Sequence, residues 1–294
     1  MNKKIALAFF GICFSWTFSW YALKMQSASQ VSIFLSLAYR FFIAALLCLV
    51  ISKIMCYKMK IDKSNLKYIL ISGATNASLN FALGYEAAKY IPSGMVAAIM
   101  SLSIITNELF SAFCDKRKVS KRTIVSGLIG TVGLILFILP TIKLSEDPRL
   151  TMLGISYALC MPILVCFGFQ SMKTCVKKTQ IPLLVYISYS FIAGCIIAFI
   201  VALFQNHNVL WDFSPKYTIS LGYLVVFASC IAYLSLYYLI DKIGSARANY
   251  SSLIYTIGAI WVSTYFEDYA WSIVNFVGFL MIIASIFNEF RKKV

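Results

Sequence analysis

Two charged side chains stand inside apolar stretches of the sequence, where an ion requires a physical explanation. Arg40 lies within F-L-S-L-A-Y-R-F-F-I-A-A-L-L, and Glu108 lies within S-L-S-I-I-T-N-E-L-F-S-A-F-C. A charge in a hydrocarbon layer costs about 2.5 to 3.5 kcal/mol on insertion scales, and such residues often mark the path of a solute or a proton. Both residues are therefore candidates for substrate contact.

Each charge also has a structural alternative. At about 1.5 Å per residue, Arg40 lies roughly 10 Å and Glu108 roughly 23 Å below the outer end of its span, so a direct pair is not expected. Arg40 could instead extend outward to Glu86, and Glu108 could rest near the inner surface. If desolvation favours the protonated carboxyl, Glu108 could carry a proton or bind a cationic substrate, which makes it the candidate for proton coupling.

A strip of small residues leads to Glu108 along one helix face. Gly94, Ala97, Ala98 and Ser101 share that face at helical spacing. Small residues allow close packing between helices in a membrane, and they can equally line a cavity. The sequence leaves both interpretations open.

Amide side chains form a second group of candidates. Asn76 and Asn80 are four residues apart and so face the same way on a helix. They either hydrogen-bond between helices, a contact worth about 0.6 kcal/mol on average, or supply polar points in a pocket. Gln170 and Asn249 are further candidates for substrate binding.

Aromatic side chains could supply the apolar walls of such a pocket. The candidates are Trp16, Tyr237 and Tyr255. Because aromatic residues make up 16% of the chain, core packing or an interfacial belt is an alternative for each of them.

Enzymatic chemistry finds little support in the sequence. The single histidine, His207, stands beside Gln205 and Asn206, and there is no HExxH motif, no glycine-rich phosphate loop and no metal-ligand spacing. We therefore expect no catalytic residue, metal or cofactor. A membrane-embedded enzyme that uses acids alone, or a lipid-handling protein, remains the alternative to a transporter.

Composition places these residues in a polytopic membrane protein. Of the 294 residues, 61% are hydrophobic and 13% charged, and the mean hydropathy is +0.82, outside the usual range of soluble domains. Apolar windows long enough to cross about 30 Å of hydrocarbon as helices recur ten times. They are 5–23, 33–52, 68–87, 93–113, 123–140, 152–172, 183–204, 218–240, 246–266 and 271–287.

The positive charges predict the orientation. Twenty of the 26 Lys and Arg residues fall in the terminal and loop segments that are cytoplasmic if the N-terminus is inside, and five fall in the others. Because Lys and Arg concentrate in cytoplasmic loops, we predict that both termini are cytoplasmic, in a bacterial-type inner membrane. The net charge of +15 is then a topology signal facing anionic lipid, and no nucleic-acid partner is expected. The oligomeric state stays open, a homodimer included.

A weak internal repeat divides the chain. Sliding it by 152 residues lays Tyr85 to Asp115 on Tyr237 to Glu267, with five identities in 31 positions and a shared plan of helix, Pro or Gly breaker, small-residue helix and closing acid. Five spans per half make the repeat inverted, and inverted repeats typically bind solute near the midplane. We expect one unit over 1–145 and the other over 146–294, with Asp115 and Glu267 on opposite surfaces.

Short motifs in this order resemble the EamA-type family of drug/metabolite transporters. That family has Trp in its first helix with Lys eight residues on, Arg before an Ala-containing run in its second, and an Ala-rich Ile-Pro-Ser turn between its third and fourth. The corresponding residues here are Trp16, Lys24, Arg40, Ala44, Ala45 and Ala87 to Ser93, with the family's closing acids at Asp115 and Glu267 and its later glycines at Gly127, Gly133 and Gly278.

The chain departs from the family at Thr17, where Gly usually follows the Trp, and at Ile104 and Thr256, which replace a helix-breaking Pro. No helix break is therefore inferred at the last two positions. The resemblance implies an all-α membrane protein of ten transmembrane helices in two inverted five-helix repeats. It also implies transport of small organic metabolites such as amino acids, amines or drugs, by exchange or proton coupling. We expect the substrate between the first, third, fourth, sixth, eighth and ninth helices.

Overall fold

The structure is a computed structural model that describes residues 3–205, 209–248 and 250–290, and every regular element in these ranges is helical. The elements of the first half are α1 (Lys3–Ser27), α2 (Ile33–Ile54), α3 (Lys63–Ser72), η1 (Gly73–Leu79), α4 (Asn80–Tyr90), α5 (Ser93–Ser101), α6 (Ser103–Cys114) and α7 (Lys121–Leu144). Those of the second half are α8 (Pro148–Thr179), α9 (Leu183–Leu203), α10 (Pro215–Tyr223), η2 (Leu224–Ile231), α11 (Ala232–Ala248), α12 (Ser251–Phe266) and α13 (Ile273–Phe290).

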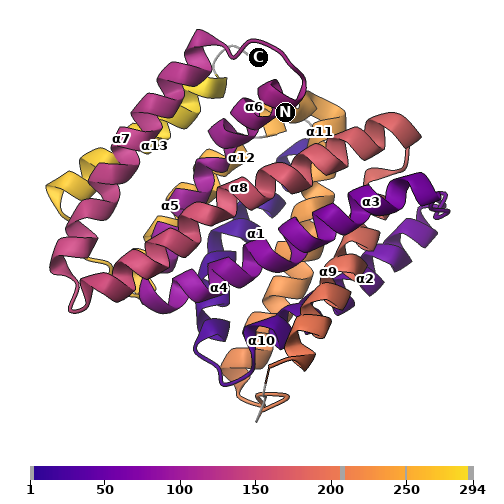
Figure 1. Cartoon of the computed structure of the whole chain (residues 1–294), viewed down its shortest axis with the longest axis horizontal. Coiled ribbons are helices and arrows are strands. Elements are labelled where there is room, and N and C mark those ends of the chain that lie inside the picture. Colours follow the sequence, from indigo (N-terminus) through magenta and orange to yellow (C-terminus); the bar gives the residue numbers. More distant parts are fainter. Residues whose placement is uncertain (1–2, 206–208, 249, 291–294) are drawn as a thin grey trace.

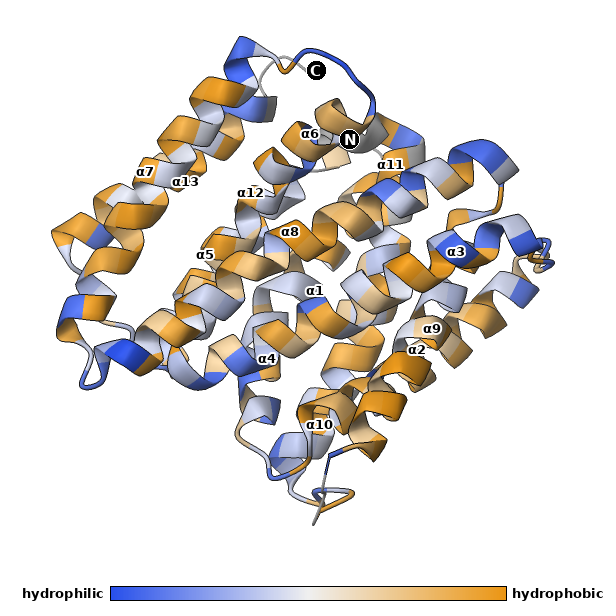
Figure 2. Cartoon of the chain, viewed as in Figure 1, coloured by the Kyte–Doolittle hydropathy of each residue, from blue (hydrophilic) through white to orange (hydrophobic). Residues whose placement is uncertain are grey.

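Within the described ranges these elements join into ten helical rods (Figure 1). The third rod is α3, the π-helical segment η1 and α4, the fourth is α5 and α6, and the eighth is α10, the π-helical segment η2 and α11. Seven rods are long and apolar enough to cross a membrane, and α13 is a shorter apolar helix. Many large hydrophobic residues are exposed on the outside of the bundle, and Figure 2 shows that hydrophobic residues predominate along outer helices such as α2 and α9.

Two local features repeat at the spacing found in the sequence. The π-helical segments begin at Gly73 and Leu224, 151 residues apart, at the same place in the third and eighth rods. Lys116 and Asp268 are exactly one sequence repeat, 152 residues, apart, and both have a left-handed backbone just after the fourth and ninth rods. Because a non-glycine residue rarely adopts this conformation, its recurrence at the repeat spacing is a structural mark of the two halves.

The packing between the halves follows the same pattern. The second rod of each half packs on its counterpart, α2 on α9, and so does the fifth, α7 on α13. Figure 1 shows the α7 and α13 pair at one edge of the bundle and the α2 and α9 pair at the opposite edge. The remaining rods lie between these pairs and enclose the interior.

The rod formed by α5 and α6 defines the two ends of the bundle. Ser93, at its beginning, contacts Glu267 at the end of α12, whereas Asp115 follows the last residue of α6. At about 1.5 Å per residue, the two acids are about 30 Å apart along the bundle. We call these the Glu267 end and the Asp115 end.

The fourth rod is interrupted without a proline. The helix is interrupted at Leu102, whose N–H is shared between the carbonyls of Ile99 and Met100. This rod is therefore interrupted although position 104 is not a proline. In α12, which has Thr256 at the equivalent position, the helix is unbroken. Ser103 begins α6 directly after this interruption.

Close approach of α7 and α13 depends on two of the glycines noted in the sequence. A Cβ added at Gly133 would lie 2.8 Å from the carbonyl oxygen of Gly278 and 2.9 Å from the backbone nitrogen of Ile282, whereas one added at Gly222 on α10 would meet nothing within 4 Å. Backbone atoms yield poorly, so Gly133→Ala is expected to destabilise the protein by about 1 to 3 kcal/mol. Gly222→Ala, the matched control, should leave stability unchanged or slightly higher. Thermal unfolding in detergent measures the difference, and equal midpoints would contradict the packing argument.

Candidate functional site

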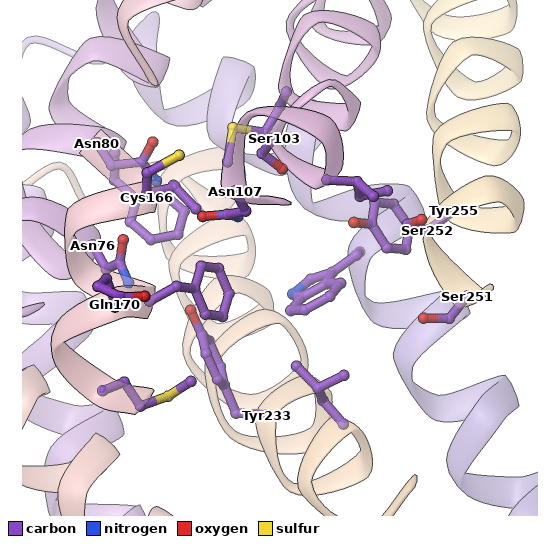
Figure 3. Close-up of a pocket in the computed structure, with 18 of the residues that line it drawn as sticks. Asn76, Asn80, Ser103, Asn107, Cys166, Gln170, Tyr233, Ser251, Ser252 and Tyr255 are labelled. Carbon is purple, nitrogen blue, oxygen red and sulfur yellow. The ribbon is translucent and has the colours of Figure 1, made fainter. Parts of the chain in front are cut away.

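A cavity of about 520 Å³ occupies the interior between the two halves. Its lining comes from α1, η1, α4, α5, α6, α8, η2, α11 and α12, with single contributions from α2 and α13. These are the first, third, fourth, sixth, eighth and ninth rods that the sequence analysis expected, together with two additional helices. Figure 3 shows polar and aromatic side chains from several of these elements facing one another across the cavity.

Most of the predicted site residues line this cavity. They are Trp16, Arg40, Asn76, Asn80, Glu108, Gln170 and Tyr255. Asn249 and His207 lie outside the described residues, as does the side chain of Tyr237. The cavity also has polar lining that the sequence analysis did not select, including Ser103, Asn107, Tyr233, Ser251 and Ser252 (Figure 3).

Arg40 does not extend outward, and the alternative of a contact with Glu86 is wrong. The residue is only 2% exposed, and its Nε donates to Ser229 Oγ at 3.1 Å. Its guanidinium lies over the ring of Phe81 at 4.3 Å, while Glu86 pairs with Lys89 at 2.9 Å. The depth of Arg40 in its span could not predict these contacts, because depth does not show which neighbouring helix the arginine faces.

Asn76 and Asn80 both face the cavity, and their Oδ1 atoms are buried without a hydrogen-bond partner in the described part of the chain. Asn76 lies on η1, directly against Gly168 of α8, where a Cβ would overlap the amide. Buried polar groups are normally paired. Unpaired oxygens at a cavity wall therefore favour the pocket interpretation of these residues over interhelical hydrogen bonding.

Ion pairs surround the Asp115 end of the cavity. Glu108 pairs with Arg117 at 2.8 Å, and Asp115 pairs with Lys173 at 2.6 Å. Lys173 lowers the pKa of Asp115 below its ordinary value, and Glu108 raises the pKa of Arg117. Glu108 is thus held in an ion pair here, not buried alone as the desolvation argument assumed, and the cavity wall at this end is formed by exposed charged residues.

The small-residue strip above Glu108 serves packing. A Cβ added at Gly94 would lie 2.9 Å from the Cα of Ile260 on α12, and Ala97 and Ala98 are buried in the interior. The close contact between α5 and α12 therefore favours helix packing over cavity lining as the role of this strip.

An aromatic wall closes one side of the cavity. The ring of Trp16 lies edge-on to Tyr233 at 6.0 Å and to Tyr255 at 5.1 Å, and its Nε1 donates to the carbonyl oxygen of Ala228 at 3.2 Å. Ala228 belongs to the π-helical segment η2. The indole thus has its one donor satisfied and presents its ring to the cavity.

The Glu267 end of the cavity is closed. Lys24 Nζ lies 2.6 Å from Glu267 Oε2, and the same carboxylate accepts hydrogen bonds from the N–H and the hydroxyl of Ser93. Leu23, which forms the floor of the cavity, is 2% exposed. One carboxylate therefore joins α1, α5 and α12 beneath the cavity, whereas at the other end the lining residues Arg117 and Lys173 have side chains 39% and 51% exposed.

Comparison with known proteins agrees with this architecture. Residues 3–139 and residues 152–288 each match the EamA-like transporter family. The fold is also similar to a protein of known crystal structure, with a TM-score of 0.69 and 14% sequence identity over 98% of this chain and 97% of that one. At this identity the likeness shows the fold alone. No curated protein matches the chain.

The apolar helices and the family match together define a multi-pass membrane protein of a transporter family. The two matches cover nearly the whole chain, one for each half, and the chain belongs to the EamA-like transporter family.

Proposed function

We propose that this protein is a secondary transporter of small organic metabolites, such as amino acids, related amines or drugs, in a bacterial-type inner membrane. Its ten helical rods cross the bilayer as two inverted five-helix repeats, with both termini in the cytoplasm. The Lys- and Arg-rich segments 53–67 and 114–122 lie at the Asp115 end, so the positive-inside rule makes this end cytoplasmic.

A single observation supports this proposal best. The central cavity reaches the Asp115 end through exposed charged residues, while the ion pair of Lys24 with Glu267 closes its other end. A solute site that is accessible from one side and sealed from the other is what alternating access requires. Rocking of the two halves would break the seal at the Glu267 end and form an equivalent one at the other, which permits export or exchange as the gradients dictate.

Reconstitution into liposomes tests the proposal. We expect uptake of a radiolabelled metabolite, from a panel of amino acids, nucleosides and amines, to saturate and to be accelerated when the liposomes contain unlabelled solute. A passive channel would show neither property, and an enzyme or a lipid-handling protein would return a chemically altered solute or none. Absence of saturable uptake across the panel would contradict the proposal.

Proton coupling is assigned to Glu108. Its carboxylate lines the cavity and is paired with Arg117, so protonation would release the arginine and alter the charge of the cavity wall. We expect Glu108→Gln to abolish the pH dependence of transport while the protein remains folded. Glu86→Gln, which removes the carboxylate of an exposed pair on the same half, should leave that dependence intact. A wild-type pH profile in Glu108→Gln would remove Glu108 from the mechanism.

A further inference from the structure

The charges that line the cavity are distributed unevenly between its two ends. At the Asp115 end, positive side chains are matched by acids, Arg117 by Glu108 and Lys173 by Asp115. Glu289, near the end of α13, also lies there and accepts a hydrogen bond from Thr123. Deeper in the cavity, about 10 Å from the Glu267 end by its place in α2, stands Arg40.

Arg40 differs from these residues because no carboxylate in the described part of the chain pairs with it. The groups around it are neutral: Ser229 accepts from Nε, the hydroxyl of Tyr85 hydrogen-bonds with the guanidinium, and the rings of Phe41 and Phe81 lie at 5.0 and 4.3 Å. The terminal nitrogen Nη1 is buried and has no hydrogen-bond partner among the described residues. A guanidinium is always charged and has five donors arranged in a planar fork.

Such a group is costly to bury unless something negative joins it during the working cycle. Aromatic faces compensate only part of the lost hydration of a cation, and removal of one partner from a buried ion pair is strongly unfavourable. Arg40 is one of the residues that line the cavity but is only 2% exposed, so a solute contacts its guanidinium once the side chains that cover it shift. A carboxylate matches the guanidinium fork in shape and in charge.

The remaining lining indicates what the rest of the solute must be. Trp16, Phe81, Tyr233 and Tyr255 surround the cavity with rings, which suits a flat apolar body. A dianion would retain one uncompensated charge beside a single arginine, and a cation would be repelled by it. The geometry points to a carboxylate-bearing solute of net charge −1 or 0 with an aromatic or apolar body, whose carboxylate binds Arg40. This inference rests on the proposed function and selects among its solutes.

A series of probes that all carry a phenyl ring compares the head groups. The five compounds are 3-phenylpropionate, phenylalanine, 3-phenylpropan-1-ol, phenethylamine and phenyl phosphate, and binding is read from the rise in melting temperature of the purified full-length protein, which requires no transport. We expect the two carboxylates to bind about 10- to 100-fold more tightly than the alcohol, the ratio given by one charge-assisted hydrogen bond. Phenethylamine should bind more weakly than the alcohol.

Variants identify the residue responsible. Arg40→Gln is expected to remove the preference for carboxylate. Arg40→Lys should retain a reduced preference, because the positive charge remains but the planar fork of donors is lost. The control Arg149→Gln, which replaces an exposed arginine at the start of α8, should behave as wild type. If Arg40→Gln does not fold, the probe series on the wild type and on Arg40→Lys still tests whether Arg40 causes the preference for carboxylate. Tightest binding of the amine or of phenyl phosphate, no selection among head groups, or an unchanged preference in Arg40→Lys would each overturn the inference.

The outcome is separable from that of the proposed function. If the protein binds carboxylates selectively but shows no counterflow, the inference about Arg40 holds and the transporter proposal fails. If the protein exchanges amines but not carboxylates, the transporter proposal holds and the inference about Arg40 fails.

Discussion

Replacement of Glu267 by Gln is expected to open the cavity at the end that is closed in this structure. Breaking a buried ion pair typically costs about 3 to 5 kcal/mol. Because the Lys24 side chain is 33% exposed, we discount this to about 1.5 to 2 kcal/mol, a shift of roughly 10- to 30-fold towards the state open at the Glu267 end. A charge-neutral amide keeps the size of the carboxylate but removes the attraction to Lys24.

The shift can be measured with a cysteine introduced at Ser19, which lines the cavity near its closed end, in a background without the nine native cysteines. An impermeant thiol reagent added outside should modify this cysteine 10- to 30-fold faster in Glu267→Gln. Two controls remove exposed carboxylates: Glu86→Gln, whose partner is Lys89, and Asp115→Asn at the opposite end. Labelling rates that rise equally in all three variants would exclude a sealing role for Glu267.

Enlargement of Gly168 is expected to weaken solute binding through Asn76. A Cβ at position 168 would overlap the Asn76 amide, which must then move from its place at the cavity wall. The affinity lost is that of one amide hydrogen bond to the solute, about 0.5 to 1.5 kcal/mol, so Gly168→Ala should lower solute affinity by roughly 2- to 12-fold.

A double-mutant cycle identifies the cause. If Gly168→Ala acts by displacing Asn76, the double variant with Asn76→Ala should bind no worse than Asn76→Ala alone, because the displaced amide is already gone. Gly222→Ala, which adds a methyl group in open space, should leave affinity unchanged. Additive losses in the double variant would instead indicate a general distortion of α8.

Hydropathy and charge predicted the helical architecture well but the limits of individual helices less well. The window 152–172 marks only the most apolar part of α8, which the structure extends from Pro148 to Thr179. An apolar window marks only the part of a helix that crosses the hydrocarbon layer. The helix can continue beyond the membrane where polar residues still favour helical structure. The π-helical segments and the interruption of the helix at Leu102 had no composition signal.

The candidate site was predictable in its residue types but not in its pairings. Asn76 and Asn80 were identified as polar points on one helix face, and they do line the cavity. The pair of Lys24 and Glu267 joins residues 243 positions apart, and both were noted only as separate motif residues. Pairing across the bundle depends on helix rotation and on neighbours in space, which a single sequence does not contain. Tyr233 was missed because one tyrosine among 18 has no distinguishing spacing.

The sidedness of the central cavity tests the account most directly. A cysteine introduced at Ser103, which faces the cavity (Figure 3), is exposed to an impermeant thiol reagent applied to one face of oriented proteoliposomes at a time. The account predicts modification from the cytoplasmic face in the resting protein, with modification from the outer face appearing in Glu267→Gln or under an outward solute gradient. Equal modification from both faces in the resting protein would contradict it, because a path open at both ends is a channel and not a carrier.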